Sequence, residues 1–342
     1  MNFLRRISSS FRRRGGNENE KPAVLAAAHA KHVLDFSEGR YKLREENKQL
    51  VVEKEDGSTV NIPFAEIALI LLSNANVSVT QAVMQSVAEF GGMLVICDYR
   101  HRPVSMMLPM EAYSVPVQRL KLQIEASQPI LKNAWQQVVK AKIRAQARCL
   151  ADEIMHCSFS DAEGLMKMAE NVKSGDTDNI EAQAAKRYWR ALFPEIEFHR
   201  DHDKGDPLNN RLNYGYTIVR AMTARAVCAT GFHPALGIHH CNQRDAFCLA
   251  DDLMEPFRPL VDWTVRIQFN ISKKLETRKL TRELTPQVKQ ELIYPLTKHF
   301  KVNGEKRKLF DIISLLAQSL VKFYSKETTE LYLPRIERVD NE

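Results

Sequence analysis

The sequence lacks several features that would place the protein in a special structural class. No apolar run approaches the ~18 residues that a membrane-spanning helix needs, and the longest run, IALILL, covers only residues 67–72. The six cysteines form no CxxC pair, and the N-terminus has no apolar core of the kind that secretory signals carry. We therefore expect a soluble cytoplasmic protein with reduced thiols, and no membrane partner.

The chain also contains no internal repeat and no long low-complexity segment. Its 342 residues are 44% hydrophobic and 27% charged, which is typical of a globular protein large enough for two domains. The formal net charge of +7 favours an acidic partner, with nucleic acid as the first candidate. Many soluble proteins are mildly basic, so the charge alone does not decide the matter.

The first 28 residues differ from the rest of the chain. The segment MNFLRRISSSFRRRGG is rich in Arg and Ser, and no acidic residue precedes Glu18. It resembles a transit peptide only superficially. We expect residues 1–28 to form a disordered basic tail, which either touches DNA or has no role.

Residues 29–115 have the pattern of a β-rich domain. In KQLVVEKEDGSTVNIPF, two partly alternating runs flank Asp56-Gly57, which predicts a hairpin. HVLDFS, MLVICDYR and PVSMML are further strand candidates, and VTQAVMQSVAEFGG has helical spacing followed by a Gly-Gly stop. We expect a small, β-sandwich-like domain here.

The pattern becomes helical after Pro116. The stretch QRLKLQIEASQPILKNAWQQVVKAKIRAQARCLADEI has apolar residues at helical spacing among many Lys, Arg and Gln residues. Further helices are expected at about 161–172, 179–192, 213–230, 242–254, 257–270, 285–299 and 307–325. The predicted fold is thus α+β: a β-rich N-terminal domain, a larger all-α domain at 116–326, and a C-terminal tail at 327–342.

The densest polar cluster is HHCNQRDAFCLADDLMEPFRPLVD, residues 239–262. Glu255 follows Asp251 and Asp252 by four and three residues, so either pair shares one face of a helix. Neighbouring carboxylates repel unless a cation lies between them. Carboxylates favour Mg²⁺, Mn²⁺ or Ca²⁺, and an imidazole from His240 would favour Mn²⁺ or another transition metal. The alternative is the solvated face of an ordinary helix. Pro256 would disturb or end the helix just after Glu255, which places that acid at a helix end, where a site is easier to build.

Two other helices carry candidate residues. In NIEAQAAKRYWRALFP, Asn179 is a plausible helix cap, and Glu181 either stabilises the positive end of the helix dipole or faces a neighbouring helix. NYGYTIVRAMTARAV is expected to be a buried helix with Arg220 and Arg225 at its polar edge. The loop that follows it delivers His239 and His240.

Four motifs in this order resemble a known family. ExxAAxxYW, LNYGY, GxHPALGIHH and DDLMEPFRPLVD look like the CRISPR-associated integrase, the metal-dependent subunit that inserts new spacers into CRISPR arrays. The stretch HHCNQRDAFCLADDLMEPFRP most resembles the branch of this family found with type II systems. The resemblance runs from about residue 30 to the end and is looser in the N-terminal half.

The resemblance implies a site in the helical domain. A Mg²⁺ or Mn²⁺ ion would be held by Glu181, His240 and Glu255, with Asp252 either binding directly or supporting a ligand. His239 is the fallback for the histidine ligand. Arg258 matches a basic position that would face phosphate; with it we assign two other arginines to DNA binding, Arg220 and Arg225.

The resemblance also implies a reaction and an assembly. A DNA 3′-hydroxyl would attack a phosphodiester of the repeat, which is a transesterification. The partners would be double-stranded DNA, as both spacer precursor and CRISPR repeat, and a second copy of the chain. Two such homodimers would flank a dimer of a second small adaptation protein, giving a hetero-hexamer.

Three alternatives remain open from the sequence. FHRDHDKGD contains the pair His202-Asp203, with His199 and Asp206 nearby, and such a pair occurs in HD-type metal phosphohydrolases. A second alternative is a DNA-binding scaffold without catalysis, although every proposed ligand position holds a competent ligand. A third is DNA cleavage, because water could replace the 3′-hydroxyl at the same site.

Overall fold

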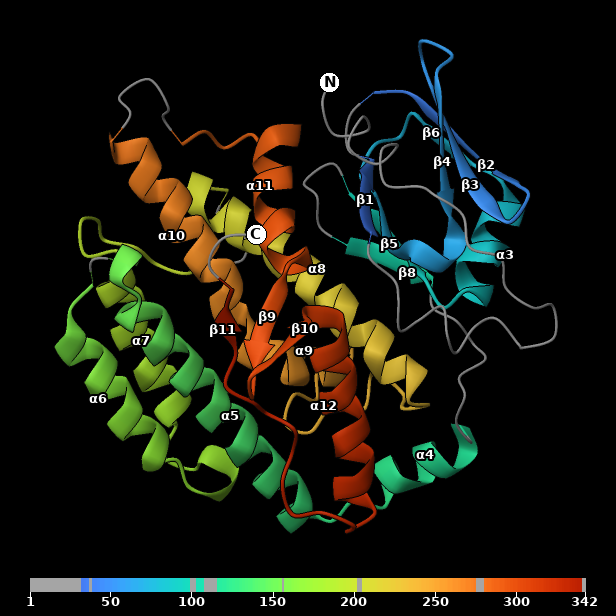
Figure 1. The fold of residues 1–342 in the computed structure, drawn as a ribbon. Helices are drawn as coiled ribbons and strands as arrows, with labels where there is room; N and C mark the ends of the chain where they lie inside the picture. Colours follow the sequence, from blue (N-terminus) through green and yellow to red (C-terminus); the bar gives the residue numbers. More distant parts are fainter. Residues whose placement is uncertain are drawn as a thin grey trace. The chain divides into compact units, whose positions relative to one another are not determined.

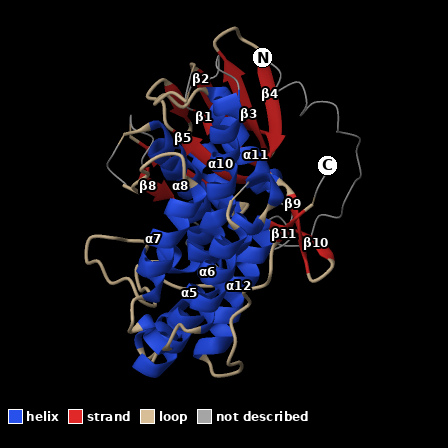
Figure 2. Ribbon diagram, turned by 90° about the vertical axis from the view of Figure 1, so that its left-hand side faces the viewer, coloured by secondary structure: helices blue, strands red, loops and turns tan. Residues whose placement is uncertain are grey.

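The computed structural model describes residues 32–36, 39–98, 103–107, 116–155, 157–201, 205–274 and 280–339. These residues separate into two compact units, one formed by the described residues up to 107 except Pro103 and the other by those from 116 onward together with Pro103. The basic tail expected at 1–28 lies outside the described residues. Figure 2 distinguishes the strands, which dominate the first unit, from the helices, which dominate the second.

The first unit contains two four-stranded sheets and a helix among its described residues. One sheet has the order β1-β5-β7-β8, in which β1, β5 and β7 run parallel, and the other has the order β4-β3-β2-β6. The element bounds are β1 (His32–Phe36), β2 (Tyr41–Glu46), β3 (Gln49–Lys54), β4 (Thr59–Pro63), β5 (Ile67–Leu72), β6 (Val77–Val79), α3 (Gln81–Glu89), β7 (Met93–Cys97) and β8 (Pro103–Met107).

Both sheets and α3 contribute to a single apolar core. Leu34 and Ile70 come from the parallel sheet, Leu50 from the other sheet, and Val83 from α3. The hairpin predicted at Asp56-Gly57 joins β3 to β4, which pair antiparallel. Strand β5 is the apolar run IALILL, buried along most of its length, as expected for a strand inside a parallel sheet.

The second unit is built mainly from helices. Their bounds are α4 (Pro116–Ile124), α5 (Gln128–Ala151), α6 (Phe159–Glu170), α7 (Ile180–Leu192), α8 (Pro207–Ala229), α9 (Cys248–Met254), α10 (Arg258–Lys274), α11 (Pro286–Thr297) and α12 (Leu309–Tyr324). Short 3₁₀ turns lie at η3 (Glu153–Met155), η4 (Ser174–Asp176) and η5 (Glu255–Phe257). Each predicted helix has a counterpart here.

Helix α5 is the longest element of the second unit, and many of the other segments pack against it. It contacts α6, α7, α9, α10, η3, η4 and η5, and Figure 1 shows it beside α6 and α7. Its buried residues recur at helical spacing, and they include Trp135, Val138, Val139, Gln146 and Cys149. Consequently, this helix presents one continuous face to the segments that carry the polar motifs.

The sequence had led us to expect an all-α second unit, and this prediction was wrong, because the unit also contains strands. Strands β9 (His299–Val302) and β10 (Glu305–Lys308) form an antiparallel hairpin, which β11 (Glu337–Arg338) extends. Asn303 and Gly304 form its turn with φ of 50° and 86°, the backbone that an Asn-Gly hairpin turn requires. A signal for this hairpin was therefore present in the sequence.

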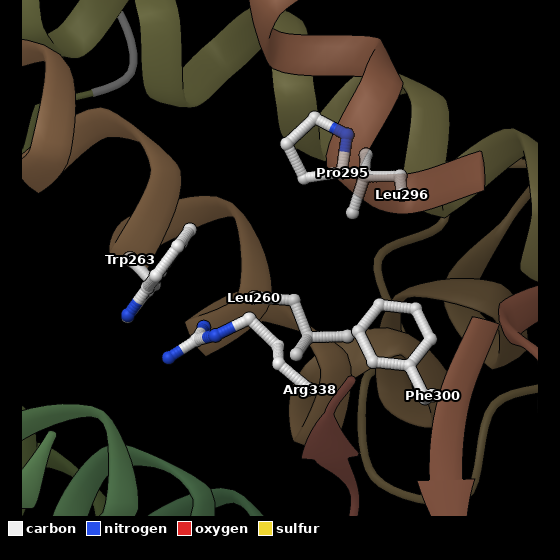
Figure 3. A pocket seen from close by; sticks show the side chains of 6 residues that line it. All are labelled: Leu260, Trp263, Pro295, Leu296, Phe300 and Arg338. Atoms are coloured by element: carbon white, nitrogen blue, oxygen red, sulfur yellow. The ribbon is translucent and has the colours of Figure 1, made fainter. Parts of the chain in front are cut away.

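The segment predicted as a C-terminal tail is fastened to the second unit as far as residue 339. Gln137 of α5 accepts a hydrogen bond from the Leu331 backbone N–H at 2.8 Å. Arg338 stacks on Trp263, with the guanidinium carbon 3.4 Å from the ring centre, and pairs with Asp152. Figure 3 shows Arg338 and Trp263 at a small pocket whose other wall is formed by α11 and β9.

Gly215 sets the separation between α8 and α10. A Cβ atom there would lie 2.3 Å from Val261 Cγ1 and 3.2 Å from Cγ2, and a valine side chain has little freedom to move away. We predict that Gly215→Ala lowers the free energy of unfolding by about 1–3 kcal/mol, as overpacked cores do. Urea denaturation measures this change.

The matched control is Gly205→Ala, because the nearest atom to its added Cβ is Asn210 Oδ1 at 4.0 Å. This variant should unfold close to wild type. Alanine is intrinsically favoured over glycine in a helix by about 1 kcal/mol, so a stabilised Gly215→Ala protein would show that the two helices can separate without cost.

Candidate functional site

The loop before α9 is wrapped around the carboxylate of Asp252. This side chain is fully buried. Its Oδ2 accepts the backbone N–H groups of Ile238 at 2.6 Å and His239 at 2.9 Å, and its Oδ1 lies 2.5 Å from the Nδ1 atom of His240. A buried carboxylate with this many donors is satisfied without a metal ion. Of the two roles left open for Asp252, the geometry favours holding a ligand in place.

Gly237 allows this loop to come so close. A Cβ at this position would lie 2.3 Å from the His240 carbonyl oxygen and 2.8 Å from Asp252 Oδ2. Because both contacts are shorter than real Cβ atoms tolerate, only glycine fits the loop as it stands. The sequence showed a glycine at this position, but it did not show that the loop requires one.

The two adjacent histidines have different environments. His240 donates from Nδ1 to Asp252, which leaves its Nε2 as the atom with a free lone pair. His239 instead stacks on Trp135, with ring centres 4.3 Å apart and an interplanar angle of 4°. Trp135 also touches the edge of His240. Of the two histidines, His240 is thus the better-placed candidate ligand, and His239 belongs to the packing that holds the loop against α5.

Glu255 begins the 3₁₀ turn η5 directly after α9 ends, close to where Pro256 led us to expect the helix to end. The residue is 5% exposed. Its Oε2 lies 2.5 Å from Lys142 Nζ, and its Oε1 lies 2.8 Å from Arg258 Nε. Burial alone would raise the pKa of Glu255, but the charges of Arg258 and Lys142 outweigh burial and lower this pKa to about 2.

Glu181 lies in the first turn of α7. Asp176, not the expected Asn179, caps this helix: its carboxylate accepts the backbone N–H groups of Ile180 at 2.9 Å and of Glu181 itself at 3.0 Å. Asn179 is in the left-handed conformation and makes no side-chain cap bond. The cap therefore orients the start of α7 and, with it, the Glu181 side chain.

Glu181 and Glu255 meet at one cation, the ammonium of Lys142. Lys142 Nζ lies 2.5 Å from Glu181 Oε1, to which it donates a hydrogen bond, and 2.5 Å from Glu255 Oε2. Burial would lower the pKa of Lys142, but the charges of Glu255 and Glu181 raise it. Both carboxylates predicted as metal ligands therefore face the same point in space, from α7 and η5.

These residues are of the types that bind a divalent cation. Within the described ranges, no three His, Cys, Asp or Glu side chains lie close enough together to hold a metal ion as they stand. The two carboxylates nevertheless share one cationic position, and His240 is close to them. The hydrogen bond with Asp252 raises the pKa of His240 most, and the charges of Glu255 and Glu181 raise it further. Two carboxylates and one imidazole suit Mn²⁺ or Mg²⁺.

A buried polar network supports the opposite side of Glu255. Arg258 lies over the ring of Tyr216 at 4.6 Å from its centre. Tyr216 and Tyr188 both donate hydrogen bonds to the carboxylate of Asp262, which is buried. Desolvation raises the pKa of Asp262 to about 7 despite the two hydrogen bonds. Arg258 is 20% exposed at its side chain, so it remains partly open to a phosphate.

The other two predicted DNA-binding arginines are engaged within the protein. Arg220 pairs with Asp251 at 2.6 Å and Asp245 at 2.7 Å. Arg225 is 5% exposed and lies against Phe310, and burial lowers its pKa to about 10. In this arrangement Arg225 is too deeply buried to touch DNA, and the charge of Arg220 is neutralised by two carboxylates.

The segment that suggested an HD-type site is only partly described. His202 and Asp203 lie outside the described residues. Asp206, the last acid of this segment, caps α8 by accepting the backbone N–H groups of Leu208 and Asn209, both at 3.0 Å. Its carboxylate therefore has a structural task that the sequence did not reveal.

Sequence reasoning missed several residues of this site. Lys142 was one of many lysines on an amphipathic helix, and only its seven-residue spacing from Trp135 would have placed the two on one face. Asp262 was read as the end of a motif, although Tyr188, its partner, is seven residues after Glu181 on α7. Asp176 lies outside the helix that it caps and had no signal in the pattern.

Comparisons with known proteins agree on one family. A sequence model of the family "CRISPR associated protein Cas1" matches residues 36–292. The chain is also 36% identical over 299 residues to a CRISPR-associated endonuclease Cas1 from Neisseria meningitidis serogroup C (strain 8013). That match covers 86% of this chain and 93% of the relative.

Solved structures share the fold. A casposase bound to integration product superposes with a TM-score of 0.71 at 20% identity, over 90% of this chain and 96% of that one. A Cas6-RT-Cas1–Cas2 complex gives a TM-score of 0.69 at 18% identity, over 93% of this chain and 36% of that one. These similarities support the mixed arrangement of N-terminal strands and a helical C-terminal region. No helix within the described ranges is long and apolar enough to cross a membrane.

Asp252 should be essential for the loop that carries His240. In Asp252→Asn, one acceptor oxygen becomes an amide that faces backbone N–H donors, and the charge that strengthens these bonds is lost. We predict a loss of about 3 kcal/mol in the free energy of unfolding, from bonds to a buried charge. Chemical denaturation measures it, and Asp178→Asn, an exposed residue that contacts the side chains of Lys173 and its neighbour Thr177, should show no measurable change.

Asp262 should make stability depend on pH. Its pKa is raised in the folded state, so between about pH 4 and pH 7 the folded protein holds a proton that the unfolded chain has lost. Stability should therefore fall as pH rises through this range, by a few kcal/mol in total from this group. Asp262→Asn should flatten that slope when unfolding is measured at several pH values; an unchanged slope would show that Asp262 is ionised throughout.

Proposed function

The chain belongs to the Cas1 family of CRISPR-associated proteins, and on that premise we propose that it is a DNA integrase of CRISPR adaptation. The reaction would insert short duplex DNA into a CRISPR repeat. Its similarity to a named CRISPR-associated endonuclease covers nearly the whole of both chains. The observation that carries the proposal is the convergence of Glu181 and Glu255, from two helical segments, on one cationic position.

The proposed chemistry is phosphoryl transfer between two DNA strands. The 3′-oxygen of the incoming duplex forms a bond to a phosphorus of the repeat, and the bond from that phosphorus to its bridging 3′-oxygen breaks. The attacking hydroxyl loses a proton, and the departing oxygen gains one. One phosphodiester is consumed and one is made, so the reaction needs no external energy source. Positioning the attacking oxygen in line is accordingly a large part of the catalysis.

The metal ligands would be Glu181, His240 and Glu255, with Mg²⁺ or Mn²⁺ as the ion. Such an ion neutralises charge on phosphoryl oxygens and lowers the pKa of a bound hydroxyl. Asp252 would hold His240 in the tautomer that leaves Nε2 available, as carboxylates do behind many ligating histidines. Arg258, fixed between Glu255 and Tyr216, is the side chain best placed to meet a phosphate oxygen.

The proposed partners follow from the family and from charge. Double-stranded DNA is both the inserted and the receiving molecule, and the net charge of +7 suits it. A casposase of similar fold is bound to integration product, and another structure of similar fold is a complex with Cas2. We propose that this chain forms a homodimer and that two such dimers assemble with a dimer of a small second adaptation protein into a hetero-hexamer.

DNA hydrolysis is the second candidate activity. Water in place of the 3′-hydroxyl would convert strand joining into cleavage without any change in the ligands. The similar Neisseria meningitidis protein carries the name endonuclease, which favours this candidate over the scaffold and the HD-type phosphohydrolase. Integration and cleavage would therefore depend on the same side chains.

The test is strand transfer of a short duplex into a repeat-bearing plasmid, with the small partner protein and Mn²⁺ or Mg²⁺ present. Glu181→Gln and His240→Ala should lose joining by about 100-fold or more, because metal and oxyanion contacts contribute at least this much. DNA binding, measured separately, should be retained. Glu163→Gln, an exposed residue of α6, should join like wild type.

Two further outcomes are decisive. His239→Ala should retain most of the joining activity, because His239 packs on Trp135 while His240 carries the free nitrogen. If joining survives the loss of both Glu181 and His240, the reacting site lies elsewhere. Tight DNA binding by wild type without any joining or cleavage would favour a scaffold.

A further inference from the structure

Lys142 occupies an unusual place for a lysine. Its side chain is only 12% exposed, and its ammonium lies 2.5 Å from an oxygen of Glu181 and 2.5 Å from an oxygen of Glu255. Lysines are rarely buried unless they are paired, because removing the charge from water is costly. Here the ammonium stands where two proposed ligands of a divalent ion converge.

The charges of the cluster balance before any metal is bound. Glu181 and Glu255 supply two negative charges, and Lys142 and Arg258 supply two positive ones. Adding a divalent ion to this arrangement would leave an excess of positive charge in a buried place. The ammonium also fills the space between these two carboxylate oxygens, which a metal ion bound to both would need.

The two cations of the cluster are held differently. Arg258 is fixed from outside the cluster by its stacking on Tyr216. Lys142 donates a directed hydrogen bond to Glu181, whereas the contacts of Lys142 Nζ with Glu255 Oε2 and of Arg258 Nε with Glu255 Oε1 are ion pairs without hydrogen-bond geometry. Lysine also has a flexible four-carbon stem and a compact charge. It is therefore the member of the cluster that can leave.

We propose that Lys142 is an internal counter-ion that occupies the metal position between Glu181 and Glu255 and is displaced when a divalent cation binds. This inference rests on the proposed ligand set. The ammonium keeps the two carboxylates together and neutralised in the metal-free protein. Metal binding is then an exchange of one cation for another, so Lys142 lowers the apparent metal affinity while stabilising the metal-free fold.

The first experiment compares wild type with Lys142→Met, which keeps the length of the side chain and removes its charge. Mn²⁺ is titrated into each protein, and free Mn²⁺ is followed by its electron paramagnetic resonance signal. Lys142→Met should bind Mn²⁺ about 10-fold more tightly, because no ammonium competes. In chelator it should melt at a lower temperature than wild type, and Mn²⁺ should raise its melting temperature by more.

Lys140→Met is the matched control. It makes the same substitution two residues earlier on α5, which places it about 200° around the helix and away from the cluster. Its Mn²⁺ affinity and its melting temperature in chelator should equal those of wild type. A general effect of losing one positive charge would appear in both variants.

The second experiment uses the wild-type protein and does not depend on the folding of a variant. Acetylation of lysine amines is followed by mass spectrometry with and without Mn²⁺. Lys142 should react slowly in chelator and faster with Mn²⁺, because displacement frees its amine. Lys140 should react at the same rate in both conditions.

The outcomes separate this inference from the proposed function. If Lys142→Met binds Mn²⁺ no more tightly than wild type, and Mn²⁺ does not expose the Lys142 amine of wild type, Lys142 is a permanent structural partner of the two glutamates. The proposed exchange of Lys142 for a metal ion then does not occur. Should Glu181→Gln still abolish Mn²⁺ binding in that case, the ligand set stands without the exchange. If Glu181→Gln leaves Mn²⁺ binding intact, the ligand set itself fails.

Discussion

The candidate site depends on the burial of two carboxylates that need cations beside them. Glu181 and Glu255 come from different helical segments and would repel each other if they met alone. Their meeting is possible because Lys142 and Arg258 bring compensating charge from α5 and from the start of α10. A buried pair is stable only when both charges are matched and bonded. The positions of α5, α7 and α10 are therefore tied to this one electrostatic requirement.

One face of α5 organises the surroundings of these charges. Trp135, Lys142 and Cys149 follow one another at intervals of seven residues, so they lie on one side of the helix, two turns apart. Trp135 stacks on His239, Lys142 pairs with the two glutamates, and Cys149 is buried beside Tyr188. Burial raises the pKa of the Cys149 thiol to about 12, so it stays neutral there. The three positions thus contact successively the histidine loop, the carboxylates and the tyrosine network.

The sequence was most informative where chemistry restricts the choice of residue. Glu181, His240 and Glu255 could be proposed because metal ligands must be of certain types and the family motifs give their order. Asp252 could be proposed as part of the site, but its role stayed open, since only the structure shows that its oxygens already accept hydrogen bonds from the loop backbone. Lys142 could not be singled out, because a lysine on an amphipathic helix normally faces water. The hairpin at Asn303-Gly304 was missed although its turn was recognisable, because the helical pattern around it dominated.

The side chains packed behind Arg258 hold its guanidinium in one place beside Glu255, which a mobile side chain would not achieve. Its guanidinium lies on the ring of Tyr216, and the hydroxyl of that ring is committed to Asp262. Tyr188 holds the other oxygen of Asp262 from α7, the same helix that carries Glu181. A shift of α7 would therefore disturb Glu181 directly and Arg258 through Asp262 and Tyr216. Both carboxylates of the site thus depend on one buried network, so the same packing that stabilises the unit fixes the distance between the two glutamates.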